Sequence, residues 1–246
     1  MKIRKYAVFM LLLFVFFGCT EYKYIHEINK DGNSVLTIKV EYSKYLEMAA
    51  ESEGKTYSEK VLEFREEKEE QCEKIKNENL NCEIEGTEVI LKMNMVPGEY
   101  YEFEKEEKIP DYIYILKINK IPNPILEDNF ILGKEDIELK YNYTDDELAS
   151  LKAAKEVGFV AEYIITMPGV IEKSNWGEYK EYENSIVFDL FEIGENPGPI
   201  IVVSKERNDF YFYIVMIVGV VLFFTIIYNL FLKNWKKEKR KRPLSK

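Results

Sequence analysis

The chain has 246 residues, with 34 lysines and arginines against 44 aspartates and glutamates, and a formal net charge of −10. The acidity lies between the two ends: residues 1–19 contribute +3 and residues 210–246 contribute +7, which leaves −20 on residues 20–209. A segment with this charge repels nucleic acid and anionic lipid headgroups, so we expect neither as its partner.

The first 18 residues have the layout of a lipoprotein signal peptide. Three basic residues within the first five precede an apolar run, residues 6–17, that is too short to cross a bilayer. The run ends in Gly18–Cys19, as in a lipobox, although Phe16 stands where an aliphatic residue is usual. We interpret Cys19 as the lipidated residue of the mature chain. The alternative is an uncleaved signal with a free cysteine.

Residues 19–209 are predicted to form one extracytoplasmic domain that begins with a β-hairpin and two helices. Alternating runs at 22–28 and 34–42 flank Asp31–Gly32–Asn33, a strong hairpin signal. Helical periodicity follows over residues 43–50, and after Gly54 a second helix is expected with its cap at Ser58. Its apolar face holds Val61, Phe64, Cys72 and Ile75. Its glutamate- and lysine-rich face is typical of a solvated helix, more than of a docking helix or coiled coil.

Further strands and one helix are predicted between residues 81 and 158. A hairpin is expected over residues 81–96 and a strand over 112–118, whereas residues 125–143 show no assignable pattern. Thr144 and Glu147 form a capping box for a helix that ends near Gly158. Asn142 begins a glycosylation sequon, a tripeptide that is common by chance.

The remainder of the domain is expected to be a three-stranded meander. The three runs are residues 159–166, 185–193 and 200–204, separated by turns that contain proline and glycine. Together the elements predict an α+β fold with a mostly antiparallel sheet and two or three helices.

Cys72 and Cys82 remain as a pair once Cys19 is assigned to lipid. An extracytoplasmic compartment permits a disulfide, whereas a metal site would need further cysteine or histidine ligands. The sole histidine, His26, is far away in the sequence, so we predict a disulfide and no metal site.

Residues 210–232 are predicted to cross the membrane. They contain no charged residue, and as a helix they would be about 34 Å long, enough to span a hydrocarbon core of about 30 Å. Residues 233–246 are strongly basic and include Trp235. Because basic residues stay cytoplasmic, this tail is expected inside the cell and the domain outside.

One motif resembles the LppM-type lipoprotein domain of bacterial and archaeal envelope proteins. The matching segments are residues 163–171, which contain Pro168 and Gly169, then Ser174–Asn175, and then residues 184–190 with Phe188 where that family commonly has tryptophan. The opening hairpin and the basic tail agree as well. The resemblance implies a non-enzymatic extracytoplasmic α+β domain that binds a lipid or another envelope component, and it implies no catalytic residues. From the residues themselves, these positions read as structural.

No pattern in the chain indicates an enzyme or a cofactor. Neither Gly-x-Ser-x-Gly nor a glycine-rich phosphate loop occurs, and His26 alternates with apolar strand residues. Two hypotheses remain. The first is a membrane-anchored module that binds a lipid or amphiphile, with aromatic residues available to line a cavity. The alternative is a structural protein that scaffolds other envelope proteins.

Overall fold

The computed structural model describes residues 21–122, 137–139, 144–156, 158, 160–176, 178–179, 184–192 and 198–241. The predicted signal peptide (residues 1–18), Cys19 and Asn142 lie outside these residues. Two compact units can be separated: residues 107–112 group with the chain from Glu206 onward, and the rest of the domain forms the larger unit.

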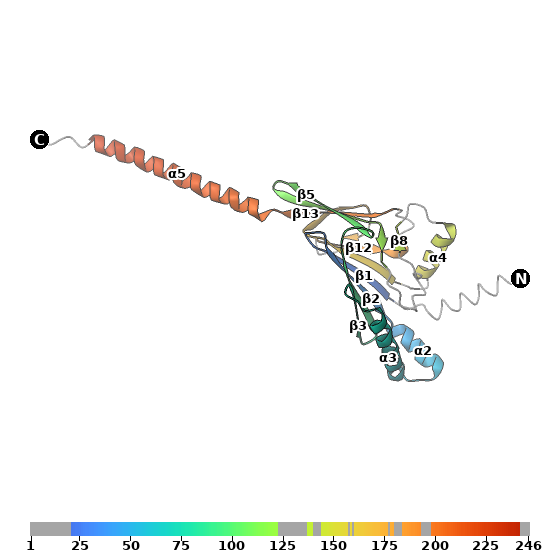
Figure 1. The fold of residues 1–246 in the computed structure, drawn as a ribbon. Helices are drawn as coiled ribbons and strands as arrows, with labels where there is room; N and C mark the ends of the chain where they lie inside the picture. The colour runs from blue at the N-terminus through green and yellow to red at the C-terminus, as the bar shows by residue number, and fades with distance from the viewer. Residues whose placement is uncertain are drawn as a thin grey trace. The chain divides into compact units, whose positions relative to one another are not determined.

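The larger unit is built on a seven-stranded sheet, called sheet A, within the described residues (Figure 1). Its order is β11 (Glu178–Tyr179), β12 (Ser185–Asp189), β9 (Val160–Thr166), β1 (Glu21–Ile28), β2 (Ser34–Glu41), β4 (Glu88–Met95) and β3 (Leu80–Glu85). Neighbouring strands are antiparallel except β1 and β9, which are parallel. The predicted hairpins at 22–42 and 81–96 are confirmed, as is the mostly antiparallel sheet.

The residues of β1, β2 and β9 alternate between a buried inner face and a partly exposed outer face. On the inner face, one row of paired residues runs from Phe188 through Tyr163 and Tyr24 to Ile38 and Leu91. All five side chains are almost fully buried. Because large aromatic side chains contribute most per residue to buried apolar area, this row is the centre of the core.

A second sheet, called sheet B, was not predicted. Its order is β10 (Val170–Ser174), β13 (Ile200–Arg207), β6 (Asp111–Ile118) and β5 (Tyr101–Lys108), and β7 (Lys120–Ile121) pairs separately with β8 (Ile137–Glu138). The predicted meander is therefore wrong in its last step, because residues 200–207 join sheet B instead of pairing with β12. The middle strand also ends earlier than expected, at Asp189, where the short 3-10 helix η1 (Leu190–Glu192) begins.

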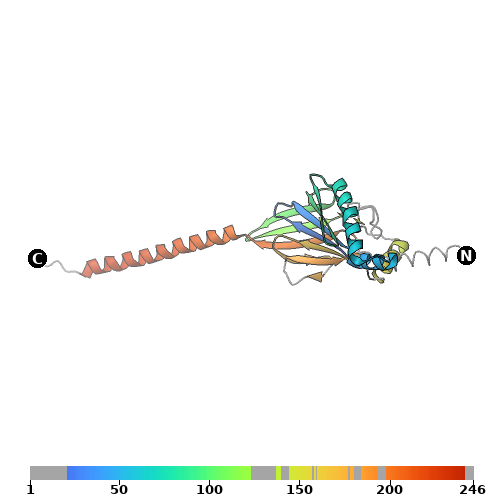
Figure 2. The ribbon, with the colours of Figure 1, turned by 90° about the horizontal axis from the view of Figure 1, so that it is seen from below.

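Three helices precede residue 209 among the described residues: α2 (Ser43–Glu53), α3 (Tyr57–Ile75) and α4 (Asp145–Glu156). Figures 1 and 2 show α3 beside β3, at the edge of sheet A. The predicted cap at Ser58 is wrong by two residues. Thr56 is the N-cap, and it forms a reciprocal capping box with Glu59. The α+β class and the number of helices are confirmed.

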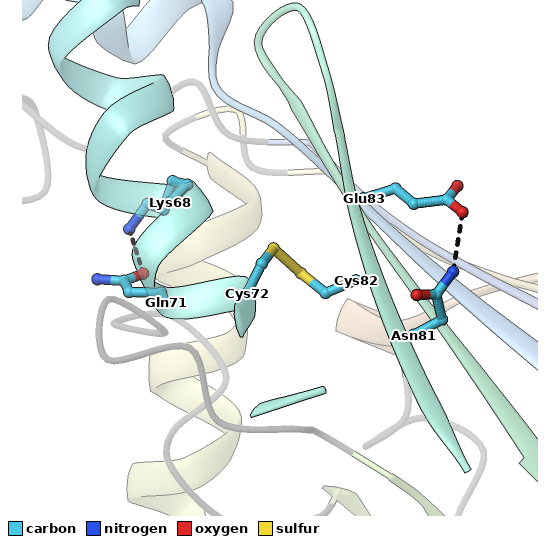
Figure 3. Close-up of a disulfide and its surroundings, with 6 residues drawn as sticks. All are labelled: Lys68, Gln71, Cys72, Asn81, Cys82 and Glu83. Carbon is cyan, nitrogen blue, oxygen red and sulfur yellow. Dashed lines mark hydrogen bonds between the residues drawn. A yellow bond between two sulfur atoms is a disulfide. The ribbon is translucent and has the colours of Figure 1, made fainter. Parts of the chain in front are cut away.

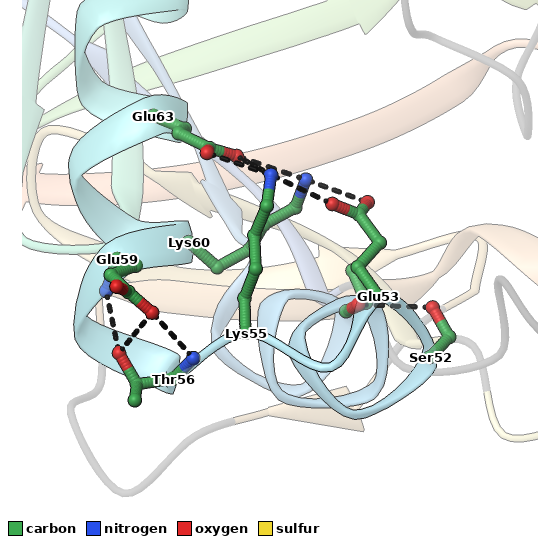
Figure 4. Close-up of polar contacts among 8 residues, drawn as sticks. Ser52, Glu53, Lys55, Thr56, Glu59, Lys60 and Glu63 are labelled. Atoms are coloured by element: carbon green, nitrogen blue, oxygen red, sulfur yellow. Dashed lines mark hydrogen bonds and ion pairs between the residues drawn. The ribbon is translucent and has the colours of Figure 1, made fainter.

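The α2–α3 connection is held by charged side chains (Figure 4). Lys55 and Lys60 each bridge Glu53 at the end of α2 and Glu63 in α3, with nitrogen–oxygen distances of 2.7–3.3 Å. These pairs are largely exposed, so each adds little to stability, but four contacts among four residues fix the angle of the turn.

Candidate functional site

The last described element, α5 (Asp209–Lys241), contains the predicted membrane span. Its first 24 residues, Asp209–Leu232, are long and apolar enough to cross a bilayer, and none of that apolar stretch is buried in the structure. Two polar side chains inside it bond to the helix itself: the Thr225 hydroxyl donates to the Val221 carbonyl, and the Asn229 amide donates to the Thr225 carbonyl. The helix supports a single-pass membrane protein. It continues past the span into the basic tail.

A chain of hydrogen bonds runs through the core of the larger unit. His26 is fully buried, with Nδ1 2.7 Å from the Tyr163 hydroxyl and Nε2 2.8 Å from Ser34 Oγ. Ser34 Oγ donates to the Tyr101 hydroxyl at 3.0 Å, and Tyr101 donates to the Gly32 carbonyl at 2.8 Å. The chain joins β1, β2 and β9 of sheet A to β5 of sheet B.

A neutral His26 satisfies all of these bonds at once. The Ser34 hydroxyl donates its proton to Tyr101, so Ser34 Oγ can only accept a hydrogen bond from His26. The imidazole proton is therefore on Nε2. Nδ1 then accepts the proton of Tyr163. Burial lowers the pKa of His26 to about 3, which agrees with a neutral ring. Ser34 and His26 have the spacing of a nucleophile and its base, and in this structure both are buried and bonded across the two sheets.

The residues of the family-like motif form the corner where the chain passes from sheet A to sheet B. Gly169 follows β9 and has φ of 78°, a left-handed conformation that suits glycine. The buried Ser204 hydroxyl of β13 donates to the Pro168 carbonyl at 2.7 Å. Phe188 packs edge-on against Trp176, with ring centroids 4.9 Å apart.

Asn175 attaches the end of β10 to β13. Its side-chain amide donates to the Pro199 carbonyl at 3.0 Å, and its side-chain oxygen accepts from the Ile201 N–H at 2.8 Å. The Asn175 N–H also donates to the Ile201 carbonyl. The side chain thus replaces a strand partner, and the described contacts of the motif are structural.

Comparison with known proteins adds no relative. A scan against protein-family models, a search of curated proteins and a search of solved structures each found no match to this chain. The resemblance to the LppM-type domain stays a prediction.

The predicted disulfide is present (Figure 3). Cys72, near the end of α3, bonds Cys82 of β3, with Cα atoms 5.2 Å apart. Cys82 shares a row with Leu91 and lies among buried residues. The bond therefore fixes α3 to the edge of sheet A. Among the described residues, no group of histidine, cysteine or carboxylate side chains could hold a metal ion.

The face of α3 directed at the core includes a lysine that periodicity alone did not predict. Lys68 is 2% exposed and lies between Phe64 and Cys72, one helical turn from each. Its ammonium group lies 5.7 Å from the ring centre of Tyr42 and 6.0 Å from that of Phe64, and it donates to the Gln71 side chain. Cation–π contact and the long aliphatic stem account for a basic residue at this position.

The outer face of sheet A carries an aliphatic row. The register places Val187 opposite Ile164 and Ile164 opposite Ile25, across β12, β9 and β1, and all three side chains are partly exposed. The neighbouring row, with Asp189 and Glu162, is charged. Sequence reasoning missed this row because it depends on the pairing of β1 with β9, which lie more than a hundred residues apart.

Proposed function

We propose that the chain is a non-enzymatic, single-pass membrane protein whose domain binds a lipid or similar amphiphile at the extracytoplasmic face. The main support for the proposal is that the last strand of the domain leads directly into the membrane helix: β13 ends at Arg207 and α5 begins at Asp209. One intervening residue keeps the domain beside the bilayer. The orientation rests on the basic residues that follow the span, and a lipid on Cys19 would provide a second anchor.

The aliphatic row of Val187, Ile164 and Ile25 is the surface on which an alkyl chain would lie. Strands are about 4.8 Å apart, so three adjacent strands offer a row about 10 Å long. A buried alkyl chain gains about 0.8 kcal/mol per methylene, so even a short contact contributes measurably. The charge of −20 on residues 20–209 favours an amphiphile with a neutral or cationic headgroup over an anionic one.

The test is native mass spectrometry of the full chain, purified from its own membranes in mild detergent, together with lipid extraction. We expect a discrete adduct of amphiphile mass that is lost in Ile164→Glu. Thr166→Glu is the matched control, since Thr166 lies on the same strand and the same face, two residues further along. A wild-type chain without adduct, or an adduct that survives in Ile164→Glu, would refute the proposal.

The second candidate function is scaffolding, and the exposed face of α3 favours it. Glu66, Glu69, Glu70 and Glu73 are all exposed there, whereas Phe64, Lys68 and Cys72 are buried on the other face. The disulfide attaches α3 to the edge of sheet A, so this acidic face has a fixed place in the domain, which suits a basic protein partner. Crosslinking in intact cells tests it: we expect a crosslinked partner that Glu66→Lys combined with Glu73→Lys removes, and recovery of the monomer alone would contradict the scaffold.

A further inference from the structure

The hairpin that joins β5 and β6 reaches the start of the membrane helix. Within the smaller unit, the N–H of Asn208 donates to the carbonyl of Pro110 at 3.0 Å. Pro110 belongs to the two-residue turn of this hairpin, and its neighbour Ile109 is 65% exposed. Asn208 is the residue immediately before α5, and it also accepts hydrogen bonds from Tyr211 and Phe212 in the first turn of that helix.

We propose that the turn at Ile109–Pro110 is a second membrane contact, in which Ile109 inserts among the lipid headgroups beside the membrane helix. This proposal is independent of amphiphile binding by sheet A. It requires only that α5 spans a bilayer.

The turn is held close to the level at which α5 enters the bilayer. A charged residue is excluded from hydrocarbon, so Asp209 marks the boundary of the span, and the exposed aromatic residues from Phe210 to Tyr213 lie where interfacial aromatic belts occur. Summing bond lengths from the Asn208 nitrogen through the Pro110 carbonyl places the Ile109 Cα within about 10 Å of it. The headgroup layer is itself roughly 5–8 Å thick on each side, so this distance brings the turn within reach of that layer.

The exposed side chain of the turn is apolar. A single exposed isoleucine on a soluble surface is ordinary, but one held at the depth of the headgroups can bury its side chain in the bilayer. Arg207 lies at the same end of the helix, with its guanidinium 4.8 Å from the ring centre of Phe212 in the first turn. The turn is flanked by Glu106, Glu107 and Asp111 as well as lysines, so its attachment is apolar and should not depend on anionic lipid.

The experiment places an environment-sensitive bimane label at Ile109→Cys in the full chain, with Cys19 replaced by serine and the Cys72–Cys82 disulfide intact. The protein is reconstituted in phosphatidylcholine vesicles that contain nitroxide lipids, with the nitroxide either in the headgroup or near the bilayer centre. Val96→Cys is the reference, because Val96 is an equally exposed aliphatic residue of the other unit, at 68%. We expect a blue-shifted emission at position 109 and headgroup quenching about twofold stronger than at position 96, unchanged by added salt or anionic lipid.

A second pair of variants isolates the hydrogen bond. Asn208→Pro removes the N–H that donates to Pro110, whereas Asn208→Ala keeps it. Quenching of the label at 109 should fall in Asn208→Pro and persist in Asn208→Ala. Quenching no stronger than at Val96 would overturn the membrane contact, and strong quenching that Asn208→Pro leaves unchanged would overturn the role of this bond in holding the turn there.

Discussion

Replacing His26 by glutamine should remove a specific part of the pH dependence of folding. Burial lowers the pKa of His26 to about 3 in the native protein, whereas an unfolded histidine titrates near 6.5. Below pH 6.5 the unfolded chain therefore binds a proton that the native chain does not, and the free energy of unfolding falls as the pH falls. Integrated between pH 7.5 and 5.0, the loss due to this one group is about 2 kcal/mol.

The assay is denaturant unfolding of the full chain in mild detergent, followed by near-ultraviolet circular dichroism at both pH values. Carboxylates also titrate in this range, so the informative quantity is the difference between wild type and His26→Gln. The variant should be about 1–3 kcal/mol less stable at pH 7.5, because it leaves the buried Tyr163 hydroxyl poorly paired, and it should lose about 2 kcal/mol less on acidification.

The control is Tyr163→Phe, which removes one partner of His26 but keeps the buried ring. It should be less stable at both pH values and retain most of the wild-type pH dependence, because burial and not the hydrogen bond causes the shift. Equal losses on acidification in wild type and His26→Gln would refute a neutral, buried His26.

Three further substitutions test the described contacts by the same unfolding assay. Cys82→Ser should cost about 3 kcal/mol, the value for a loop closed across ten residues, and dithiothreitol should have a similar effect on wild type; a midpoint insensitive to reduction would contradict this. Asn175→Ala should cost about 2 kcal/mol, since the Pro199 carbonyl and the Ile201 N–H both lose their partner, and a neutral outcome would show that water replaces the side chain. Gly32→Ala should destabilise the fold by at least about 1–3 kcal/mol, because φ at Gly32 is +87° and an added Cβ would lie 2.6 Å from the Phe103 ring. Gly86→Ala is the control: its φ is also positive but nothing lies within 4 Å, so it measures the backbone strain without the clash.

Local patterns in the sequence predicted the elements whose stability is local. The hairpin around Asp31–Gly32–Asn33 followed from strict alternation and a turn in which the Asp31 side chain accepts from Asn33. Helical periodicity predicted Phe64 and Cys72 on the buried face of α3, whereas Val61 and Ile75, predicted on the same face, are partly exposed. The disulfide followed from cysteine parity and compartment. The residues that determine the hairpin and the helix face are near one another in the chain. The cysteines are so few that assigning Cys19 to lipid leaves one possible pair.

The parts that were missed depend on tertiary context. Strand β5 is rich in glutamate, which disfavours strands, yet it forms because it is an edge strand with Tyr101 as its one fully buried residue. Cross-strand pairs such as Lys117 with Glu102, at 2.8 Å, compensate part of its charge. The parallel pairing of β1 with β9 has no local signature either, and without it neither sheet B nor the chain from Tyr163 to Tyr101 could be anticipated.

The packing of the aromatic residues decides where a ligand should be sought. Sequence reasoning offered the abundant aromatic residues as the lining of a cavity, but Tyr24, Tyr101, Tyr114 and Tyr163 are each fully buried in the described core. Tyr163 and Tyr101 also use their hydroxyls to brace the two sheets through His26 and Ser34. An amphiphile in that space would have to break these bonds, at about 1–3 kcal/mol for each buried group left unpaired. An amphiphile that binds on the outer row at Ile164 breaks none of these hydrogen bonds. Ile164→Glu, and not a core substitution, is therefore the decisive variant for the binding hypothesis.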